Sequence, residues 1–138
     1  MRMYRKFTRL VFFLVALAFF AFQLSACGGK QVTARQADQG RTIVLKMGET
    51  LMVTLDSNPS TGYSWQVSEV DENVLKQDGE PQYKQAADSQ GLVGAGGTET
   101  FRFQTVGRGK TTLKLIYARS WEKDVPPVET YSLTVVVE

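Results

Sequence analysis

The 138-residue chain contains no histidine and only one cysteine, Cys27. Without histidine, neither a Ser-His-Asp triad nor a Cys-His pair can be assembled. No group of residues has the spacing of a zinc site, and a single cysteine cannot form a disulfide within the chain. These absences predict a protein that is not an enzyme, that carries no metal or cofactor, and that is held together by packing.

Other signatures of chemistry are also missing. No part of residues 27–138 repeats apolar residues with a sustained helical period. The "GAGG" of residues 94–97 lacks the lysine and the serine or threonine of a phosphate-binding loop. Asp71 and Glu72 are adjacent, so on a strand their side chains would point to opposite faces and could not act as a pair. We therefore expect no catalytic residues.

Residues 1–26 have the organisation of a signal peptide. A basic segment precedes an uncharged apolar run at residues 10–22, which is too short for an ordinary membrane-spanning helix. Small residues then lead to Cys27, as a signal peptidase requires. The basic residues are Arg2, Arg5, Lys6 and Arg9.

The segment "LSAC" at residues 24–27 resembles the bacterial lipobox, in which the cysteine is acylated and becomes the first residue of the mature protein. The resemblance implies a lipoprotein anchored to a bacterial membrane through lipid, palmitate included, on Cys27. Gly28 stands where an aspartate would retain the protein in the inner membrane. In a Gram-negative cell we therefore expect the outer membrane, facing the periplasm. An ordinary signal peptide with an incidental cysteine is the alternative.

Removal of residues 1–26 changes the sign of the net charge. The full chain has 16 Lys and Arg against 14 Asp and Glu, a net charge of +2, and loss of four basic residues leaves 12 against 14, or −2. Nothing in the mature chain therefore indicates a nucleic-acid partner. Residues 27–40 are polar without a clear period and are predicted to be a flexible tether. Residues 41–138 are predicted to form one domain, expected to be monomeric.

From residue 41 onward, short segments alternate apolar and polar residues, which is typical of half-buried strands. Leu51, Val53 and Leu55 share one face of such a segment, and Phe101 and Phe103 share one face of another. About seven or eight short antiparallel strands of this kind predict an all-β fold, an immunoglobulin-like β-sandwich. A small closed barrel is the alternative.

Three unusual loops interrupt the strands. The first, within "SNPSTGYSW" at residues 57–65, contains Pro59, which fixes one φ angle, and Gly62, which can adopt a positive φ. The second contains "GAGG" at residues 94–97, and the third contains "RSW" at residues 119–121. Loops of a sandwich cluster at its two ends, and one end is often the binding site.

Taken in order, these loops resemble those of the chagasin family, immunoglobulin-like inhibitors of papain-like cysteine peptidases, which carry an N-P-T-T-G-[YF] loop, a G-x-G-G loop and an R-P-W loop. The similarity covers roughly residues 42–138. Ser60 replaces a threonine and keeps the hydroxyl, whereas Ser120 replaces the proline of R-P-W and frees a φ angle.

The resemblance implies a reversible, non-covalent inhibitor that occludes the active-site cleft of a papain-like cysteine peptidase. In that family the first loop enters the cleft as a wedge, and the other two flank it. The residues implied to bind the peptidase are Asn58, Pro59, Ser60, Thr61, Gly62, Tyr63, Gly94, Ala95, Gly96, Gly97, Arg119, Ser120 and Trp121.

Simpler interpretations exist for the aromatic residues. Tyr63 and Trp65 alternate with Val67, which favours positions in the core. Trp121 instead breaks the alternation and lies among polar residues, so we expect it to be exposed and to contact a partner.

Simpler interpretations also exist for the other loop residues. Residues 94–97 could form only a flexible loop, and Arg119 could be a solvated charge or pair with Glu122. An immunoglobulin-like envelope lipoprotein that binds a non-peptidase protein or peptide is the alternative function, because a fold alone does not define an activity.

Overall fold

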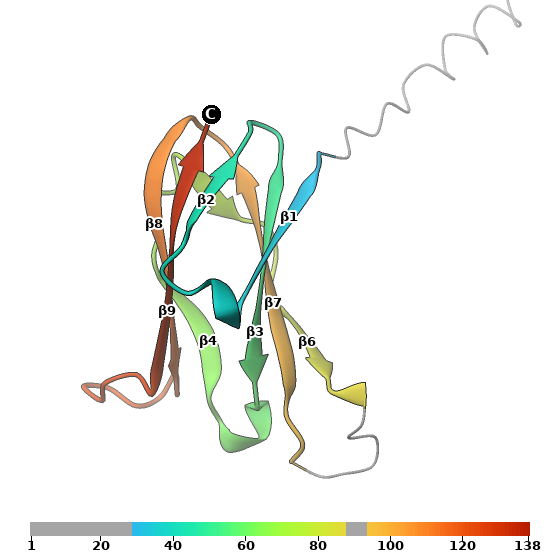
Figure 1. Ribbon diagram of the computed structural model, residues 1–138. Helices are drawn as coiled ribbons and strands as arrows, with labels where there is room; N and C mark the ends of the chain where they lie inside the picture. Colours follow the sequence, from blue (N-terminus) through green and yellow to red (C-terminus); the bar gives the residue numbers. More distant parts are fainter. Residues whose placement is uncertain (1–28, 88–93) are drawn as a thin grey trace, which may run out of the picture.

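The computed structural model describes residues 29–87 and 94–138, which form a sandwich of two β-sheets (Figure 1). Nine strands occur within these residues, where seven or eight were expected. The strands are β1 (Gln31–Arg35), β2 (Thr42–Leu45), β3 (Thr50–Ser57), β4 (Ser64–Glu69), β5 (Leu75–Gln77), β6 (Gln82–Gln85), β7 (Gly97–Thr105), β8 (Gly109–Ala118) and β9 (Glu129–Val137).

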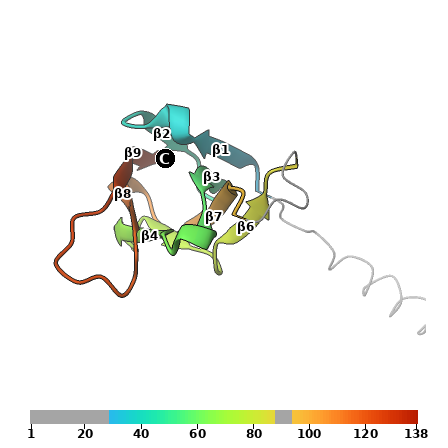
Figure 2. The same cartoon turned by 90° about the horizontal axis from the view of Figure 1, so that it is seen from below.

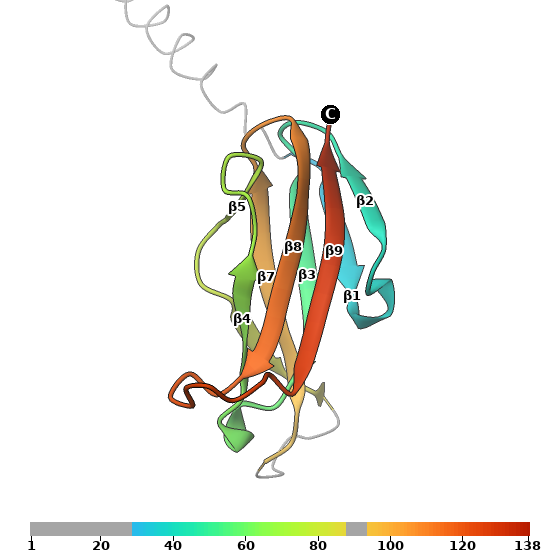
Figure 3. The ribbon, with the colours of Figure 1, turned by 90° about the vertical axis from the view of Figure 1, so that its left-hand side faces the viewer.

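One sheet has the strand order β1-β3-β7-β5, with β6 also paired to β7, and the other has the order β2-β9-β8-β4. Figures 1 and 3 show β3 and β7 of the first sheet facing β8 and β9 of the second. The β1–β3 and β2–β9 pairings are parallel, and the other described pairings are antiparallel. The prediction of a sandwich is confirmed. The prediction that the strands are antiparallel is wrong for β1 and β2, the two N-terminal strands, which lie at sheet edges.

Apolar residues that alternate along the strands fill the space between the sheets. Leu51, Val53 and Leu55 of β3 have no exposed surface and belong to one hydrophobic cluster with residues from the other long strands. Burial of each large apolar side chain contributes about 1.5–3 kcal/mol, so packing holds the sheets together. The other strand residues in the cluster include Phe101, Phe103, Leu113, Leu115, Tyr131, Leu133, Val135 and Val137.

Residues 31–38 are part of the domain, and the prediction of a flexible tether up to residue 40 is wrong for them. β1 pairs with β3 along its whole length, and a short 3-10 turn, Gln36–Asp38, follows it. Ala34 is fully buried, and Val32 packs against the core. Their outward-facing neighbours are polar, so a strand that buries only two small apolar residues resembles a linker in sequence.

Removal of β1 is expected to destabilise the domain measurably. The Tyr131 hydroxyl donates to the Arg35 carbonyl oxygen at 2.9 Å, and burial, followed by the nearby charge of Asp38, raises the pKa of Tyr131 to about 12. A chain that begins at Arg41 loses this bond, the burial of β1 and the cover over the edge of β3. Compared with a chain that begins at Gly29, its free energy of unfolding in urea should fall by about 2 kcal/mol or more. Equal unfolding curves would show that β1 contributes nothing.

The two ends of the sandwich differ. Lys30 lies beside the start of β3, where its carbonyl oxygen accepts a hydrogen bond from the Thr50 N–H at 3.1 Å. Figure 1 shows that this end also holds the C-terminus, and that the three unusual loops lie at the opposite end. We call residues 58–62 loop one, residues 94–97 loop two and residues 119–128 loop three.

No helix within residues 29–87 and 94–138 is long and apolar enough to cross a membrane. The predicted signal peptide, Cys27 and Gly28 lie outside the described residues.

Candidate functional site

Loop one is a single turn of 3-10 helix, Pro59–Thr61, between Asn58 and Gly62. Pro59 occupies the first helical position, where a missing N–H has little cost. Gly62 ends the turn in the left-handed conformation, with φ 82° and ψ −3°, which glycine adopts without steric penalty. Pro59, Ser60 and Thr61 are exposed, so the turn presents a compact tip to solvent.

Asn58 holds this turn to its surroundings. Its Oδ1 accepts hydrogen bonds from the N–H and the hydroxyl of Ser60, at 3.3 and 2.6 Å. Its Nδ2 donates to the Gly94 carbonyl oxygen in loop two at 3.0 Å, and its backbone N–H donates to the Tyr117 hydroxyl at 2.8 Å. One asparagine therefore fixes loop one internally, to loop two and to the end of β8.

Arg119 connects loop three to loop one. Its Nε and Nη2 both donate to the Thr61 carbonyl oxygen, at 3.2 and 3.1 Å. Its Nη1 lies 3.0 Å from Oε1 of Glu122, and its Cζ lies 4.4 Å from the centre of the Tyr63 ring. The interpretation of Arg119 as the partner of Glu122 is confirmed. Its guanidinium is engaged within the protein, so we infer that it positions loop one.

The two aromatic residues after loop one have different surroundings. Trp65 is 2% exposed, which confirms its place in the core, and its Nε1 donates to the Asp56 carbonyl oxygen at 2.8 Å. Tyr63 precedes β4 and is only half-buried, so its assignment to the core is wrong. Its ring stacks on Tyr117 with ring centres 5.6 Å apart. The glycine turn just before it ends the alternation, which leaves Tyr63 between Tyr117 and Arg119.

The glycines of loop two serve the protein's own structure. Gly94 has φ 82°, and Gly97 is the first residue of β7, between β3 and β6. A Cβ atom at Gly97 would lie only 2.2 Å from the Lys84 carbonyl oxygen. Gly97 is therefore required by the close approach of β6, and the interpretation of residues 94–97 as only a flexible loop is wrong at this position. The preceding residues 91–93 lie outside the described residues.

Trp121 lies at the tip of a turn in loop three. The Glu122 N–H donates to the Arg119 carbonyl oxygen at 3.2 Å, which places Ser120 and Trp121 at the two central positions of the turn. The Trp121 side chain is 65% exposed, as expected from the sequence. A Cβ atom at Gly62 would lie 2.5 Å from its Cη2, so the indole rests directly against loop one.

Ser120→Pro is expected to stiffen loop three. Ser120 occupies the first central position of the turn, where proline is favoured, and within the described residues no hydrogen bond from its N–H is found. The substitution should raise the free energy of unfolding by about 0.4–1 kcal/mol, chiefly by restricting the unfolded chain. Urea unfolding measures this change, and a less stable variant would show that the backbone at Ser120 does not suit proline.

Two supporting residues were missed by reasoning from the sequence. Tyr117 shares the alternation of Leu113 and Leu115, which indicates a common face of the strand but no contact with loop one. Glu99 is 7% exposed, and its Oε2 accepts hydrogen bonds from the Ser57 hydroxyl at 3.1 Å and from the Trp65 N–H at 3.2 Å. Glu99 alternates along β7 with the buried Phe101 and Phe103, so its side chain points to the same face. This alternation in the sequence could have revealed it.

Tyr117→Phe is expected to loosen loop one while keeping the aromatic stack. The change removes the acceptor of the Asn58 N–H, and an unsatisfied part-buried donor costs about 1–3 kcal/mol. Urea unfolding measures this loss. Tyr63→Phe is the matched control, because the Tyr63 hydroxyl has no hydrogen bond to the described residues. If both variants unfold like the parent, the Tyr117 hydroxyl does not hold loop one.

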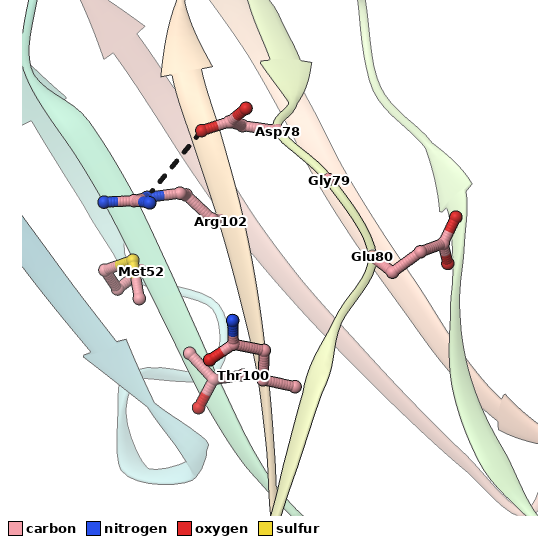
Figure 4. Close-up of a pocket in the computed structure, with 7 residues that line it drawn as sticks. Met52, Asp78, Gly79, Glu80, Thr100 and Arg102 are labelled. Carbon is pink, nitrogen blue, oxygen red and sulfur yellow. Dashed lines mark ion pairs between the residues drawn. The ribbon is translucent and has the colours of Figure 1, made fainter.

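A shallow hollow of about 370 Å³ lies away from these loops, on the face of β3 and β7 (Figure 4). Asp78 and Arg102 approach to 3.8 Å there, and Gln104 donates to Asp78 at 2.9 Å, whereas Glu80 points away from them. No group of three or more potential metal-binding side chains occurs in the described part of the chain. Asp78 and Arg102 are occupied in joining the β5–β6 connection to β7, so we place the functional site at the loops.

Viewed end-on, the 3-10 turn of loop one lies between loop three and the start of β7 (Figure 2). The arrangement is an immunoglobulin-like sandwich in which loop one, at one end, is hydrogen-bonded to both loop two and loop three. The family model of the chagasin family peptidase inhibitors, I42, matches residues 44–135. The chain belongs to the chagasin family.

Individual relatives agree with this assignment. Amoebiasin-2 of Entamoeba histolytica is 31% identical over 97 residues, which cover 70% of this chain and 76% of the relative. The crystal structure of EhICP2, a cysteine protease inhibitor from Entamoeba histolytica, matches 80% of this chain and 98% of its own with a TM-score of 0.71 and 23% identity. PbICP-C, solved in complex with falcipain-2, matches 80% of this chain and 100% of its own, with a TM-score of 0.52 and 20% identity.

Proposed function

We propose that this chain is a reversible, non-covalent inhibitor of papain-like cysteine peptidases, and that loops one, two and three occlude the active-site cleft. The observation that carries the proposal is the bracing of loop one, through Asn58 to loop two and through Arg119 to loop three. A loop that is already ordered loses little entropy on binding, which favours affinity. Family membership and the falcipain-2 complex of PbICP-C support the same target class.

The exposed tip of loop one is suited to enter a cleft as a wedge and to bind there through surface complementarity. Pro59, Ser60 and Thr61 are exposed to solvent, while hydrogen bonds from Ser60 to Asn58 and from Arg119 to Thr61 hold their backbone in place. Trp121 adds a large rigid surface beside them, and tryptophan is enriched among the residues that dominate binding energies. Since the binding involves no reaction, it should be competitive and fully reversible.

Titration of a papain-like peptidase tests the proposal. A chain that begins at Gly29, and so retains β1, should inhibit competitively at micromolar concentration or below, and activity should return on dilution. A peptidase that stays fully active at such concentrations would contradict the proposal for that enzyme. Recovery of a non-peptidase partner through the same loops would favour the alternative function.

We also propose that Cys27 is lipidated and anchors the protein to a bacterial membrane, which is the outer membrane in a Gram-negative cell. The lipobox-like "LSAC" segment after the apolar run supports this proposal. Mass spectrometry of the mature protein should find acyl chains on Cys27, and Cys27→Ser should abolish them. A mature protein with an unmodified Cys27 would contradict the anchor but not the inhibition.

A further inference from the structure

The end of the sandwich at which the described chain begins is opposite to the three loops. β3 runs between the two ends, from Thr50, whose N–H donates to the Lys30 carbonyl oxygen, to Ser57, which precedes loop one. Seven steps of a strand span about 23 Å. The inhibitory loops are therefore separated from Lys30 by nearly the full length of the domain (Figure 1).

The link between Cys27 and the domain is very short. Only Gly28 and Gly29 separate Cys27 from Lys30, which already contacts β3. Four chain steps from Cys27 to Gln31 reach at most about 14 Å, which is less than the length of β3. A lipid on Cys27 therefore cannot reach the membrane unless the Lys30 end of the sandwich, with Met47 and Val106 on its turns, stays close to the bilayer.

We propose that the anchored domain stands on its Lys30 end and directs loops one, two and three away from the membrane. This inference rests on the proposed lipidation of Cys27 and extends it to an orientation. The partner that fits is a peptidase dissolved in the aqueous phase, which approaches the loops from the side opposite the bilayer. The anchor then keeps the inhibitor at the membrane without covering its binding surface.

The distribution of tryptophan makes the orientation measurable. The chain has two tryptophans; Trp65 is buried at 2% exposure, whereas Trp121 in loop three is 65% exposed. In the acylated protein reconstituted into vesicles, iodide in the buffer should quench Trp121 strongly. A lipid with a nitroxide on its headgroup should leave the emission almost unchanged.

A second reporter provides the matched control. Met47 lies on the turn between β2 and β3 at the Lys30 end and is 43% exposed. In a Trp121→Phe, Met47→Trp variant, the nitroxide lipid should quench emission several-fold more than it does in the parent protein. Nitroxide quenching of Trp121 equal to that of the Met47 reporter would overturn the proposed orientation.

Measurement of inhibition distinguishes a failure of the proposed orientation from a failure of the proposed inhibitory function. The vesicle-bound protein should inhibit a soluble papain-like peptidase with the same inhibition constant as the lipid-free chain from Gly29, and a tenfold weaker effect on vesicles would contradict the exposed orientation. If the lipid-free chain does not inhibit, the proposed function fails while the quenching result still decides the orientation. An unacylated Cys27 in the mature protein overturns the inference at its first step.

Discussion

Trp121→Ala is expected to weaken inhibition of a papain-like peptidase by about 1–4 kcal/mol, which corresponds to a several-fold to a thousandfold rise in the inhibition constant. The indole is 65% exposed, yet it rests against Gly62 and is held by the turn that Arg119 closes. It therefore offers a large apolar surface in a fixed position, and its loss removes both contact area and pre-organisation.

The stability of the free domain should hardly change in this variant, because Trp121 contributes little buried surface. Val128→Ala is the matched control, since Val128 lies on the same loop and is 60% exposed. We expect its inhibition constant to stay within a factor of about three, as for surface changes outside a hot spot. An unchanged constant for Trp121→Ala, measured by competitive titration, would remove Trp121 from the binding surface.

Gly62→Ala is expected to damage both loop one and the position of the indole. The φ of 82° at this residue is costly for alanine, at about 1–2 kcal/mol. The new Cβ would also lie 2.5 and 3.0 Å from Cη2 and Cζ2 of Trp121, so the ring must move. The inhibition constant should rise about tenfold or more, because the tip and its largest neighbour are displaced together.

Gly94→Ala separates these two causes. Gly94 also has φ 82°, but among the described residues a Cβ there would meet only the Ser60 hydroxyl oxygen, at an ordinary 3.7 Å. This variant should lose a similar free energy of unfolding with a much smaller loss of inhibition. If both variants inhibit equally, contact with Trp121 is not the reason for glycine at position 62.

The sandwich could be predicted from the sequence because a strand that buries one face has an apolar residue at every second position. This alternation identifies both the strands and the residues that point inward. Leu51, Val53 and Leu55 were placed correctly on this basis alone. β1 was missed because it buries only Val32 and Ala34 against the core. The parallel pairings of β1 with β3 and of β2 with β9 could not be predicted, since local alternation carries no information on which strand lies alongside.

The loop motifs predicted which residues gather at one end, but not how they hold one another. Arg119 illustrates the limit: the family resemblance implied a contact with the peptidase, and only the structure shows the contacts of its guanidinium with Thr61, Glu122 and Tyr63. Such hydrogen bonds depend on loops distant in the sequence. The role of Tyr117 could not be predicted for the same reason, because alternation gives the direction of a ring and not the partner of its hydroxyl.

The parallel pairing of β2 with β9 also determines when the domain can be completed during synthesis. Thr42 lies beside Thr134, so the second sheet cannot close until almost the entire chain has been made. Such non-local contacts slow folding, because a long loop must be ordered before they form. The edges of the early strands stay open to other chains during this interval. A truncated product that lacks β9 would therefore lack β2's only described partner and be prone to aggregation.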